Sequence, residues 1–346
     1  MKLPNHVLII AEAGVNHNGD MKMARRLIDA AVDAGADVVK FQSFRAEALV
    51  IRNAPKARYQ IKNTKKGGAQ WDMLKKLELS PGDHRALFAY ARKRRIAIIS
   101  TPFDDKNADL LERLRVPFYK LPSGEVTNKP LLEHVAAKGI SIILSTGMCT
   151  LEEVRQAVGW IRSVWNKKKR NPGLVLLHCV SQYPAKPEDC NLRAMATLRN
   201  AFRVPVGYSD HTLGIEIPLA AAALGAQIIE KHLTLDNKLP GPDHLASLEP
   251  KAFKEMVLGI RNIEKSLGDG VKRPKPNEME IRRIARRSLV AANPLLKGAP
   301  LKRDDLCAKR PGTGIPPEYF ETLIGMKPKH PISADTILEW KDFRHA

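Results

Sequence analysis

The chain has 346 residues, 44% of them hydrophobic and 27% charged, a globular composition that excludes disordered and fibrous proteins. This length suits one large barrel with a small appendage. The formal net charge is +20 at pH 7, with basic runs at 65–66, 92–95 and 167–170. Because these runs lack interleaved aromatic residues and a zinc-finger pattern, we expect solvated helix faces that attract small anions, with nucleic-acid binding as a minor alternative.

Localisation and thiol chemistry follow from simple counts. No apolar run reaches the length of a membrane-spanning helix, and the N-terminal residues lack a signal-peptide pattern, so we expect a cytoplasmic protein. Four cysteines are scattered without CxxC pairing: Cys149, Cys179, Cys190 and Cys307. This spacing predicts free thiols in a reducing compartment and argues against a zinc cluster.

Apolar, β-branched runs alternate with amphipathic segments as far as residue 268. Eight runs predict strands, at 7–14, 37–42, 96–103, 117–125, 141–148, 174–181, 204–210 and 227–233. The intervening segments predict helices, with a capping box at Thr150 and Glu153 and a helix end at Gly35. Continuous apolar strands are typical of a covered parallel sheet, so we predict an α/β fold, a (β/α)8 TIM barrel. A doubly wound sheet is the alternative, but EAGVNHNG (12–19) lacks its glycine fingerprint.

Two further segments interrupt or follow the barrel pattern. The insertion 45–74 comes after the second strand, and a loop of that length favours a functional role. Beyond the barrel, 271–284 is rich in charges and proline and predicts a linker. The remainder, 285–346, combines short apolar runs with Pro and Gly and predicts a small β-rich domain. We therefore expect a barrel over 1–270, the linker and the small domain.

Polar or ionisable residues end all of the predicted strands. In chain order they are Glu12, Lys40, Gln42, Thr101, Lys120, Ser123, Glu125, Ser145, Thr146, Ser181, Tyr183, Ser209, Asp210, His211, Glu230 and His232. The carboxyl ends of barrel strands meet at one face, where active sites lie. Because an unpartnered buried charge is costly, we expect these side chains to face one another or a ligand. A solvated loop residue would explain a single case, but not the whole set.

The residue types predict the chemistry of this site. Two lysines and several hydroxyls favour binding of a phosphate plus a carboxylate: Lys40, Lys120, Thr101, Ser123, Ser145 and Ser209. His211 and His232 end neighbouring strands and suit one divalent ion, although each alone would be a hydrogen-bonded core histidine. Glu12 and Glu125 are available for acid–base work or water positioning. Asp243, in the loop 239–244, is either a turn residue or a contact to a substrate hydroxyl.

Ten motifs resemble those of a known family. In chain order they are EAGVNHNGD, ADVVKFQ, ISTPFD, YKLPSGE, ILSTGM, LHCVSQYP, GYSDHTLG, EKHLTLD, PGPDH and KRPGTG. The chain resembles the bacterial sialic acid (nonulosonic acid) synthases over nearly its whole length, and its C-terminal part is similar to an antifreeze-like (SAF) domain. The resemblance implies that phosphoenolpyruvate condenses with an open-chain N-acetylmannosamine-type sugar. The products would be a 2-keto acid and phosphate, formed by C–O cleavage with manganese, magnesium or cobalt.

The resemblance also implies roles for individual residues. Phosphoenolpyruvate would be held by Lys40, Thr101, Lys120, Ser123, Ser145, Ser181 and Ser209. The metal would be held by His211 and His232, and the sugar by Gln42, Tyr183, Asp243 and Arg310. Glu125 would direct the attacking water, and Glu12 would transfer a proton or orient the group at the metal. Arg310 resembles an arginine that one subunit places in its partner's site, which implies a domain-swapped homodimer.

The acceptor sugar and the enzyme class leave alternatives. We expect an N-acetylneuraminate synthase using N-acetylmannosamine; the alternative is an N,N'-diacetyllegionaminate synthase using 2,4-diacetamido-2,4,6-trideoxymannose, and pseudaminate is less favoured. Ser181 and Gln182 replace asparagine and isoleucine of a family member, a departure that a different sugar would explain. An aldolase with a Schiff-base lysine would need no metal. A non-catalytic carbohydrate-binding protein would not need the converging lysines, histidines and glutamates.

Overall fold

The computed structural model describes residues 3–64 and 67–344, so the basic pair 65–66 lies outside the described residues. The chain divides into two compact units, 1–268 and 269–346. Each unit has its own cluster of buried apolar side chains. All four cysteines lie in the described part and are free thiols, as predicted. Within the same residues, none of the helices combines the length and the apolar character that a membrane span requires.

The first unit is built on eight parallel strands. They are β1 (Leu8–Gly14), β2 (Val38–Ser43), β3 (Ala97–Pro102), β4 (Tyr119–Leu121), β5 (Ile142–Ser145), β6 (Leu174–Cys179), β7 (Val206–Asp210) and β8 (Ile228–His232). The hydrogen-bonded order is β3-β2-β1-β8-β7-β6-β5-β4, so that β1 pairs with both β2 and β8. β3 and β4 lie side by side and complete the ring. The predicted (β/α)8 barrel is confirmed.

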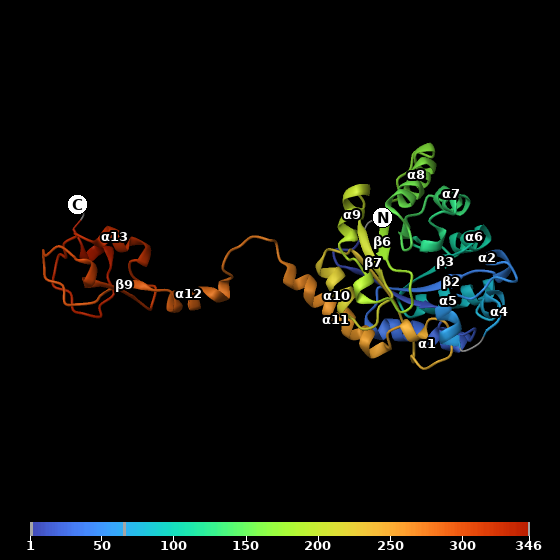
Figure 1. The fold of residues 1–346 in the computed structure, drawn as a ribbon, viewed down its shortest axis with the longest axis horizontal. Coiled ribbons are helices and arrows are strands. Elements are labelled where there is room, and N and C mark those ends of the chain that lie inside the picture. Colours follow the sequence, from blue (N-terminus) through green and yellow to red (C-terminus); the bar gives the residue numbers. More distant parts are fainter. Residues whose placement is uncertain (1–2, 65–66, 345–346) are drawn as a thin grey trace. The chain divides into compact units, whose positions relative to one another are not determined.

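Helices lie around the outside of these strands (Figure 1). They are α1 (Met21–Ala34), α5 (Pro81–Lys93), α6 (Asp105–Arg113), α7 (Lys129–Ala137), α8 (Leu151–Lys167), α9 (Ala194–Phe202), α10 (Glu216–Ala223) and α11 (Pro250–Leu267). The predicted capping box of Thr150 and Glu153 begins α8. Gly35 ends α1 at φ 82°, a left-handed conformation that glycine adopts without steric cost.

The insertion 45–74, expected as a long loop, contains three short helices instead. These are α2 (Ala46–Leu49), α3 (Arg58–Thr64) and α4 (Gln70–Lys75). The reason is a small apolar cluster of its own, in which Leu74 and Leu77 pack with Phe44 and Val15. Burial of these side chains supplies the stabilisation that short helices lack in isolation.

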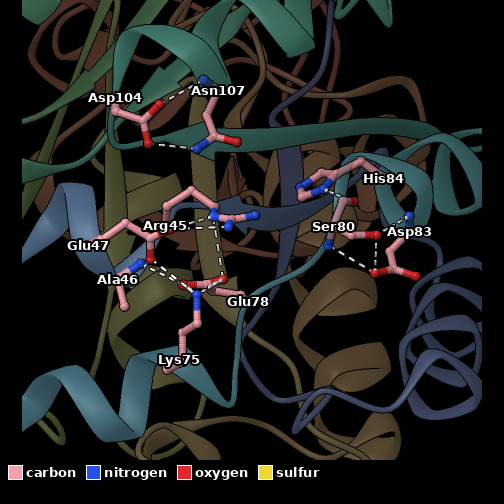
Figure 2. A network of polar contacts seen from close by, with 10 residues as sticks. All are labelled: Arg45, Ala46, Glu47, Lys75, Glu78, Ser80, Asp83, His84, Asp104 and Asn107. Atoms are coloured by element: carbon pink, nitrogen blue, oxygen red, sulfur yellow. Dashed lines mark hydrogen bonds and ion pairs between the residues drawn. The ribbon is translucent and has the colours of Figure 1, made fainter.

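Ion pairs join the two ends of this insertion (Figure 2). Lys75 Nζ lies 3.1 Å from Glu47 Oε2 and 3.1 Å from Glu78 Oε2. Arg45 Nε lies 3.5 Å from Glu78 Oε2. Glu78 Oε1 also accepts a hydrogen bond from the backbone N–H of Ala46 at 2.7 Å. We call Arg45, Glu47, Lys75 and Glu78 the base network, because they close the insertion where it leaves the barrel.

The second unit contains less regular structure. Its elements are α12 (Met279–Ala285), β9 (Ser288–Ala291), β10 (Leu306–Lys309) and α13 (Phe320–Leu323). β9 and β10 form an antiparallel pair, and single bridges such as Leu295–Ile332 extend the β pairing. α12 falls in the predicted linker, where its helix-forming residues follow a 3-10 turn begun by Pro276.

Short 3-10 helices complete both units. They are η1 (Ser123–Glu125), η2 (Pro187–Asp189), η3 (His244–Ala246), η4 (Pro276–Glu278), η5 (Arg303–Asp305), η6 (Pro317–Tyr319) and η7 (Trp340–Asp342). Two of them bear on the site: η1 directly follows β4, and η3 directly follows Asp243.

Candidate active site

Side chains alternate between the two faces of each strand, and this alternation determines which polar side chains point into the barrel. On β1, Ile9 and Ala11 pack with the outer helices, whereas Leu8 and Ile10 belong to the interior cluster. Side chains two apart share a face of a strand, so Glu12 continues the interior series. The same rule places Glu230 and His232 after Ile228 on β8.

One cavity at the carboxyl ends of the strands collects most of the predicted site residues. Those that line it are Glu12, Lys40, Gln42, Thr101, Lys120, Ser123, Ser145, Tyr183, Ser209, His211 and His232. Three lining residues, Phe103, Pro122 and Cys179, were not predicted, and Glu230 was predicted to face the site without a specific role. The predicted convergence of the strand ends is therefore present in the fold.

Two lysines and two glutamates form a buried network on the floor of this cavity. Lys40 Nζ lies 3.0 Å from Glu12 Oε1 and 3.6 Å from Glu230 Oε1. Lys120 Nζ lies 3.4 Å from the same Glu230 oxygen. The second carboxylate oxygens of Glu12 and Glu230 are buried without a hydrogen-bond partner. Orphaned polar atoms of this kind indicate a place where a ligand is received.

Burial and mutual charge set the protonation of this network. Burial raises the pKa of Glu12, with Lys40 opposing and Glu230 adding to the effect. Burial alone would raise the pKa of Glu230, but Lys120 and Lys40 lower it. Burial lowers the pKa of Lys120, against the attraction of Glu230. Glu12 is thus the carboxyl best suited to hold a proton, while Glu230 stays ionised between the lysines.

Hydroxyl groups surround the lysines. Lys40 Nζ donates to Thr101 Oγ1 at 3.1 Å, and Ser209 Oγ donates to Glu230 Oε1 at 3.0 Å. Ser145 Oγ is buried without a partner. Two ammonium groups among hydroxyls make a site for a small dianion.

Gly147 brings three further side chains of this wall together. Its N–H donates to Ser123 Oγ at 2.8 Å. A Cβ atom at this position would lie 2.4 Å from Ser181 Oγ and 2.8 Å from Cys179 Sγ. The close approach explains the glycine and places Ser181 beside Ser123, although Ser181 is not among the residues that line the cavity.

His211 and His232 meet at the mouth of the barrel. Their ring centroids are 5.5 Å apart. Burial lowers the pKa of His211 to about 4, and burial together with His211 lowers that of His232 well below its usual value. Both rings are therefore neutral at pH 7, the form that binds metals. His211 Nδ1 donates a hydrogen bond to the Val180 carbonyl at 2.6 Å, so Nε2 is the nitrogen available to a metal. His232 Nδ1 is buried without a hydrogen-bond partner.

These two rings fit a divalent ion whose other ligands come from substrate and water. Among the described residues, no group of three or more His, Cys, Asp or Glu side chains is arranged to hold a metal by itself. An open coordination sphere of this kind is typical of catalytic rather than structural metal sites. The metal role of both histidines stays a prediction.

Behind the histidines, a buried ion pair joins β7 and β8. Asp210 and Lys231 are opposite each other in the ladder and point away from the cavity. Lys231 Nζ lies 2.5 Å from Asp210 Oδ2 and donates to the Thr212 carbonyl. Neither side chain is exposed to solvent. The pair therefore fixes the backbone on both sides of His211.

Loops build the outer end of the site. Tyr183 packs against His211, with ring centroids 4.1 Å apart, and Tyr59 of α3 stacks on Tyr183 at 5.1 Å. Asp243 is buried beside them, and burial, with Glu12 adding to the effect, raises its pKa to about 7. On β2, Gln42 Nε2 donates to Glu12 Oε1 at 3.1 Å and so holds the carboxyl of the lysine network.

Like Ser181, the predicted residues Asp243, Glu125 and Arg310 do not line the cavity. Glu125 lies on η1 just beyond Ser123, where its Oε2 accepts a hydrogen bond from Asn128 at 2.6 Å and burial raises its pKa. Arg310 is exposed on the second unit. Their roles in water direction and in the partner's site stay predictions.

Comparison with known proteins places the chain in a family. Residues 27–272 match the family model described as the NeuB family, and residues 286–344 match the SAF domain. The chain belongs to the NeuB family. The match confirms the resemblance drawn from the motifs, and the second match confirms the identity of the C-terminal domain.

Relatives of this NeuB-family chain extend over nearly its full length. It is 48% identical to the N,N'-diacetyllegionaminic acid synthase of Legionella pneumophila, covering 96% of this chain and 93% of that one. It is also 48% identical to the protein of the same name from Campylobacter jejuni, covering 92% and 94%. Since these relatives are synthases, the prediction of an enzyme is confirmed and the non-catalytic alternative is set aside.

A solved structure shares the architecture of this NeuB-family chain. It is the N-acetylneuraminic acid (sialic acid) synthetase of Leptospira borgpetersenii in complex with citrate. The sequence identity is 39%, the match covers 81% of this chain and 92% of that one, and the TM-score is 0.69. The (β/α)8 fold of the first unit therefore agrees with that of a structure determined independently.

Proposed function

We propose that the protein is an N,N'-diacetyllegionaminate synthase, which condenses phosphoenolpyruvate with 2,4-diacetamido-2,4,6-trideoxymannose. The observation that carries the choice of sugar is the 48% identity to two synthases named for that product. The expected main acceptor, N-acetylmannosamine, is supported by a structural relative at 39% identity and becomes the second candidate. The relatives thus favour the alternative over the main expectation.

The lysine network supports the binding of phosphoenolpyruvate. Lys40 and Lys120 would donate charge-assisted hydrogen bonds to its phosphate and carboxylate, and hydroxyls such as Thr101 and Ser145 would add neutral ones. In the reaction, carbon 3 of phosphoenolpyruvate forms a bond to the aldehyde carbon of the open-chain sugar. Water adds at carbon 2, the C–O bond to phosphate breaks, and the products are the 2-keto acid and inorganic phosphate.

The remaining residues would handle protons and orientation. Glu12, whose pKa is raised by burial, would hold a proton near the reacting aldehyde, and Gln42 would keep its carboxyl in place. Glu125 would direct the water. A divalent ion, manganese in our proposal, would when bound by His211 and His232 polarise the sugar aldehyde. The proposed homodimer, with Arg310 serving the partner's site, stays a prediction.

The test is phosphate release from phosphoenolpyruvate labelled with ¹⁸O in its bridging oxygen. The two sugars are assayed side by side with manganese, and EDTA is the control. We expect labelled phosphate, higher kcat/KM for the diacetamido sugar, and loss of activity with EDTA. Labelled phosphate from N-acetylmannosamine alone would instead support the second candidate. A borohydride-trapped adduct on Lys40 or Lys120, formed without metal, would contradict the proposal and support an aldolase.

A further inference from the structure

An aromatic ring of the insertion reaches the outer end of the active site. Tyr59 stacks on Tyr183 with an interplanar angle of 26°, and Tyr183 in turn packs on His211. Such centroid distances are within the range of favourable aromatic pairs. The three rings form a continuous row that starts at a candidate metal ligand and ends on α3. A sugar whose aldehyde lies near His211 would extend its far carbons along this row.

The position of Tyr59 is determined by the contacts of its helix. Asn63 Nδ2 donates to the Pro242 carbonyl at 2.6 Å, so α3 is fastened to the loop that carries Asp243. At the other end of the helix, the buried Gln60 side chain accepts from the Ala57 N–H at 2.9 Å. The bond from Asn63 therefore ties the helix that carries Tyr59 to the loop at the outer end of the site, and the Gln60 bond closes the start of that helix.

The base network fixes the segment from which α3 extends (Figure 2). Its ion pairs hold Arg45 and Glu47, at the start of the insertion, against Lys75 and Glu78 at its end. Closing a loop at its base reduces the conformations open to the residues within it. Tyr59 thus lies in a segment whose two ends are joined to each other at the barrel.

We propose that Tyr59 is a specificity-determining residue that covers the apolar far end of the acceptor sugar. This inference rests on the proposed function. The two candidate sugars differ at carbon 4, which carries an acetamido group or a hydroxyl, and at carbon 6, which is a methyl or a hydroxymethyl group. The face of a tyrosine ring gains by covering methyl groups. A hydroxymethyl group at the same place would lose water without gaining a partner.

The contacts of Tyr59 separate it from the reacting groups. Within the described residues, its recorded contacts are the ring stack on Tyr183 and a long hydrogen bond from Gln60 Nε2 to its hydroxyl, at 3.5 Å. Neither of these contacts joins Tyr59 to Lys40, Lys120, Glu12 or Glu230. Burial raises the pKa of the Tyr59 hydroxyl, with Asp243 contributing, so the ring is neutral when it meets the sugar. Removing the ring should thus change sugar selection and spare phosphoenolpyruvate binding.

The test compares Tyr59→Ala and Tyr59→Phe with the control Ile61→Ala. Ile61 lies on the same helix, is 45% exposed, and tests for a general effect of altering α3. For each variant, kcat/KM is measured with both sugars at saturating phosphoenolpyruvate, together with KM for phosphoenolpyruvate. We expect Tyr59→Ala to lower the preference for the diacetamido sugar at least about tenfold, chiefly through KM for that sugar. Tyr59→Phe, which keeps the ring, should retain the preference within about threefold.

Three results would overturn the inference. The first is a Tyr59→Ala enzyme whose preference is unchanged, or whose kcat/KM falls equally for both sugars. The second is an equal loss of preference in Ile61→Ala, which would assign the effect to the helix and not to the ring. The third, a wild-type enzyme that forms no keto acid from either sugar, overturns the proposed function and this inference with it. The wild-type assay therefore separates the two failures.

Discussion

The inner and outer halves of the active site are built from different parts of the chain. The inner half, with Lys40, Lys120 and Glu230, stands on barrel strands, and each charged group has an oppositely charged neighbour within 4 Å. The outer half, with Tyr59 and Asp243, stands on an insertion and a loop. Strand positions are fixed by the register of the whole sheet, whereas loops change with little effect on it.

The contrast separates two tasks of the enzyme. Side chains on strands are held by the packing of neighbouring strands, which suits groups that must meet a reacting atom within tenths of an ångström. Side chains on loops suit the choice among related sugars, which requires a different surface and not a different reaction. We therefore expect changes to the inner half to abolish activity and changes to the outer half to shift selectivity.

The largest effect should come from Lys120→Met. The variant lacks one of the two ammonium groups, those of Lys40 and Lys120, that would bind phosphoenolpyruvate. We expect kcat/KM for phosphoenolpyruvate to fall by about 10³-fold. Phosphate release measures the loss, and Lys93→Met, at an exposed position, is the matched control. Because Lys120 and Glu230 are paired, combining Lys120→Met with Glu230→Gln should cost less than the sum of the single effects. Activity within tenfold of wild type would show that Lys120 does not bind the substrate.

The next effect concerns the buried pair behind the histidines. Removing Lys231 alone would leave Asp210 charged and unpaired in the interior, so the variant of choice is the double change Asp210→Asn with Lys231→Met. We expect it to fold and to bind Mn²⁺ about 100-fold more weakly, because His211 loses the contacts that fix its backbone. Electron paramagnetic resonance of free Mn²⁺ measures the affinity without an activity assay. If the folded double variant bound Mn²⁺ as tightly as wild type, the Asp210–Lys231 pair would have no role in positioning His211.

The smallest effect lies in the outer half, at Asp243. Its folded-state pKa of about 7 exceeds the ordinary value of 3.8, so the folded protein binds the proton more tightly than the unfolded chain. The protonated Asp243 carboxyl therefore stabilises the folded state at low pH, and this contribution is lost as the pH rises to about 7. Asp243→Asn removes the penalty, and we expect its stability relative to wild type to improve by about 2.5 kcal/mol between pH 5 and pH 8, most of it below pH 7. Thermal unfolding of the metal-free proteins tests this, and a constant difference across that range would contradict it.

The inner half was predictable from the sequence because its signals are local. A continuous run of apolar, β-branched residues identifies a buried strand, and the alternation of side chains along that strand carries Glu12 and His232 into the barrel. Glu230 was already among the predicted strand-end residues, and counting on from Leu177 in the same way would have assigned Cys179 to the cavity. The sequence-based assignment favoured residues beyond the strand ends, such as Ser181, over the last interior position of the strand.

The outer half was not predictable because its contacts are distant along the chain. Tyr59 reaches the site through the hydrogen bond between Asn63 and Pro242, which are 179 residues apart. The helices of the insertion depend on a small core shared with residues of β1 and β2 loops, such as Val15 and Phe44. α12 was missed for another reason, since the prolines and charges before it resemble a linker until Pro276 is considered as the first residue of a 3-10 turn that leads into the helix.

The base network has a consequence for how new acceptors arise in this fold. The ion pairs of the base network join the two ends of the insertion to each other. The stretch between those ends is therefore a unit that can be exchanged as a whole. Replacing residues 50–70 with the matching stretch of another synthase, while keeping the base network, would change the outer wall of the site. The strands that carry the reacting groups would stay the same. Natural drift could follow the same route, exchanging this stretch while the strands beneath it remain unchanged.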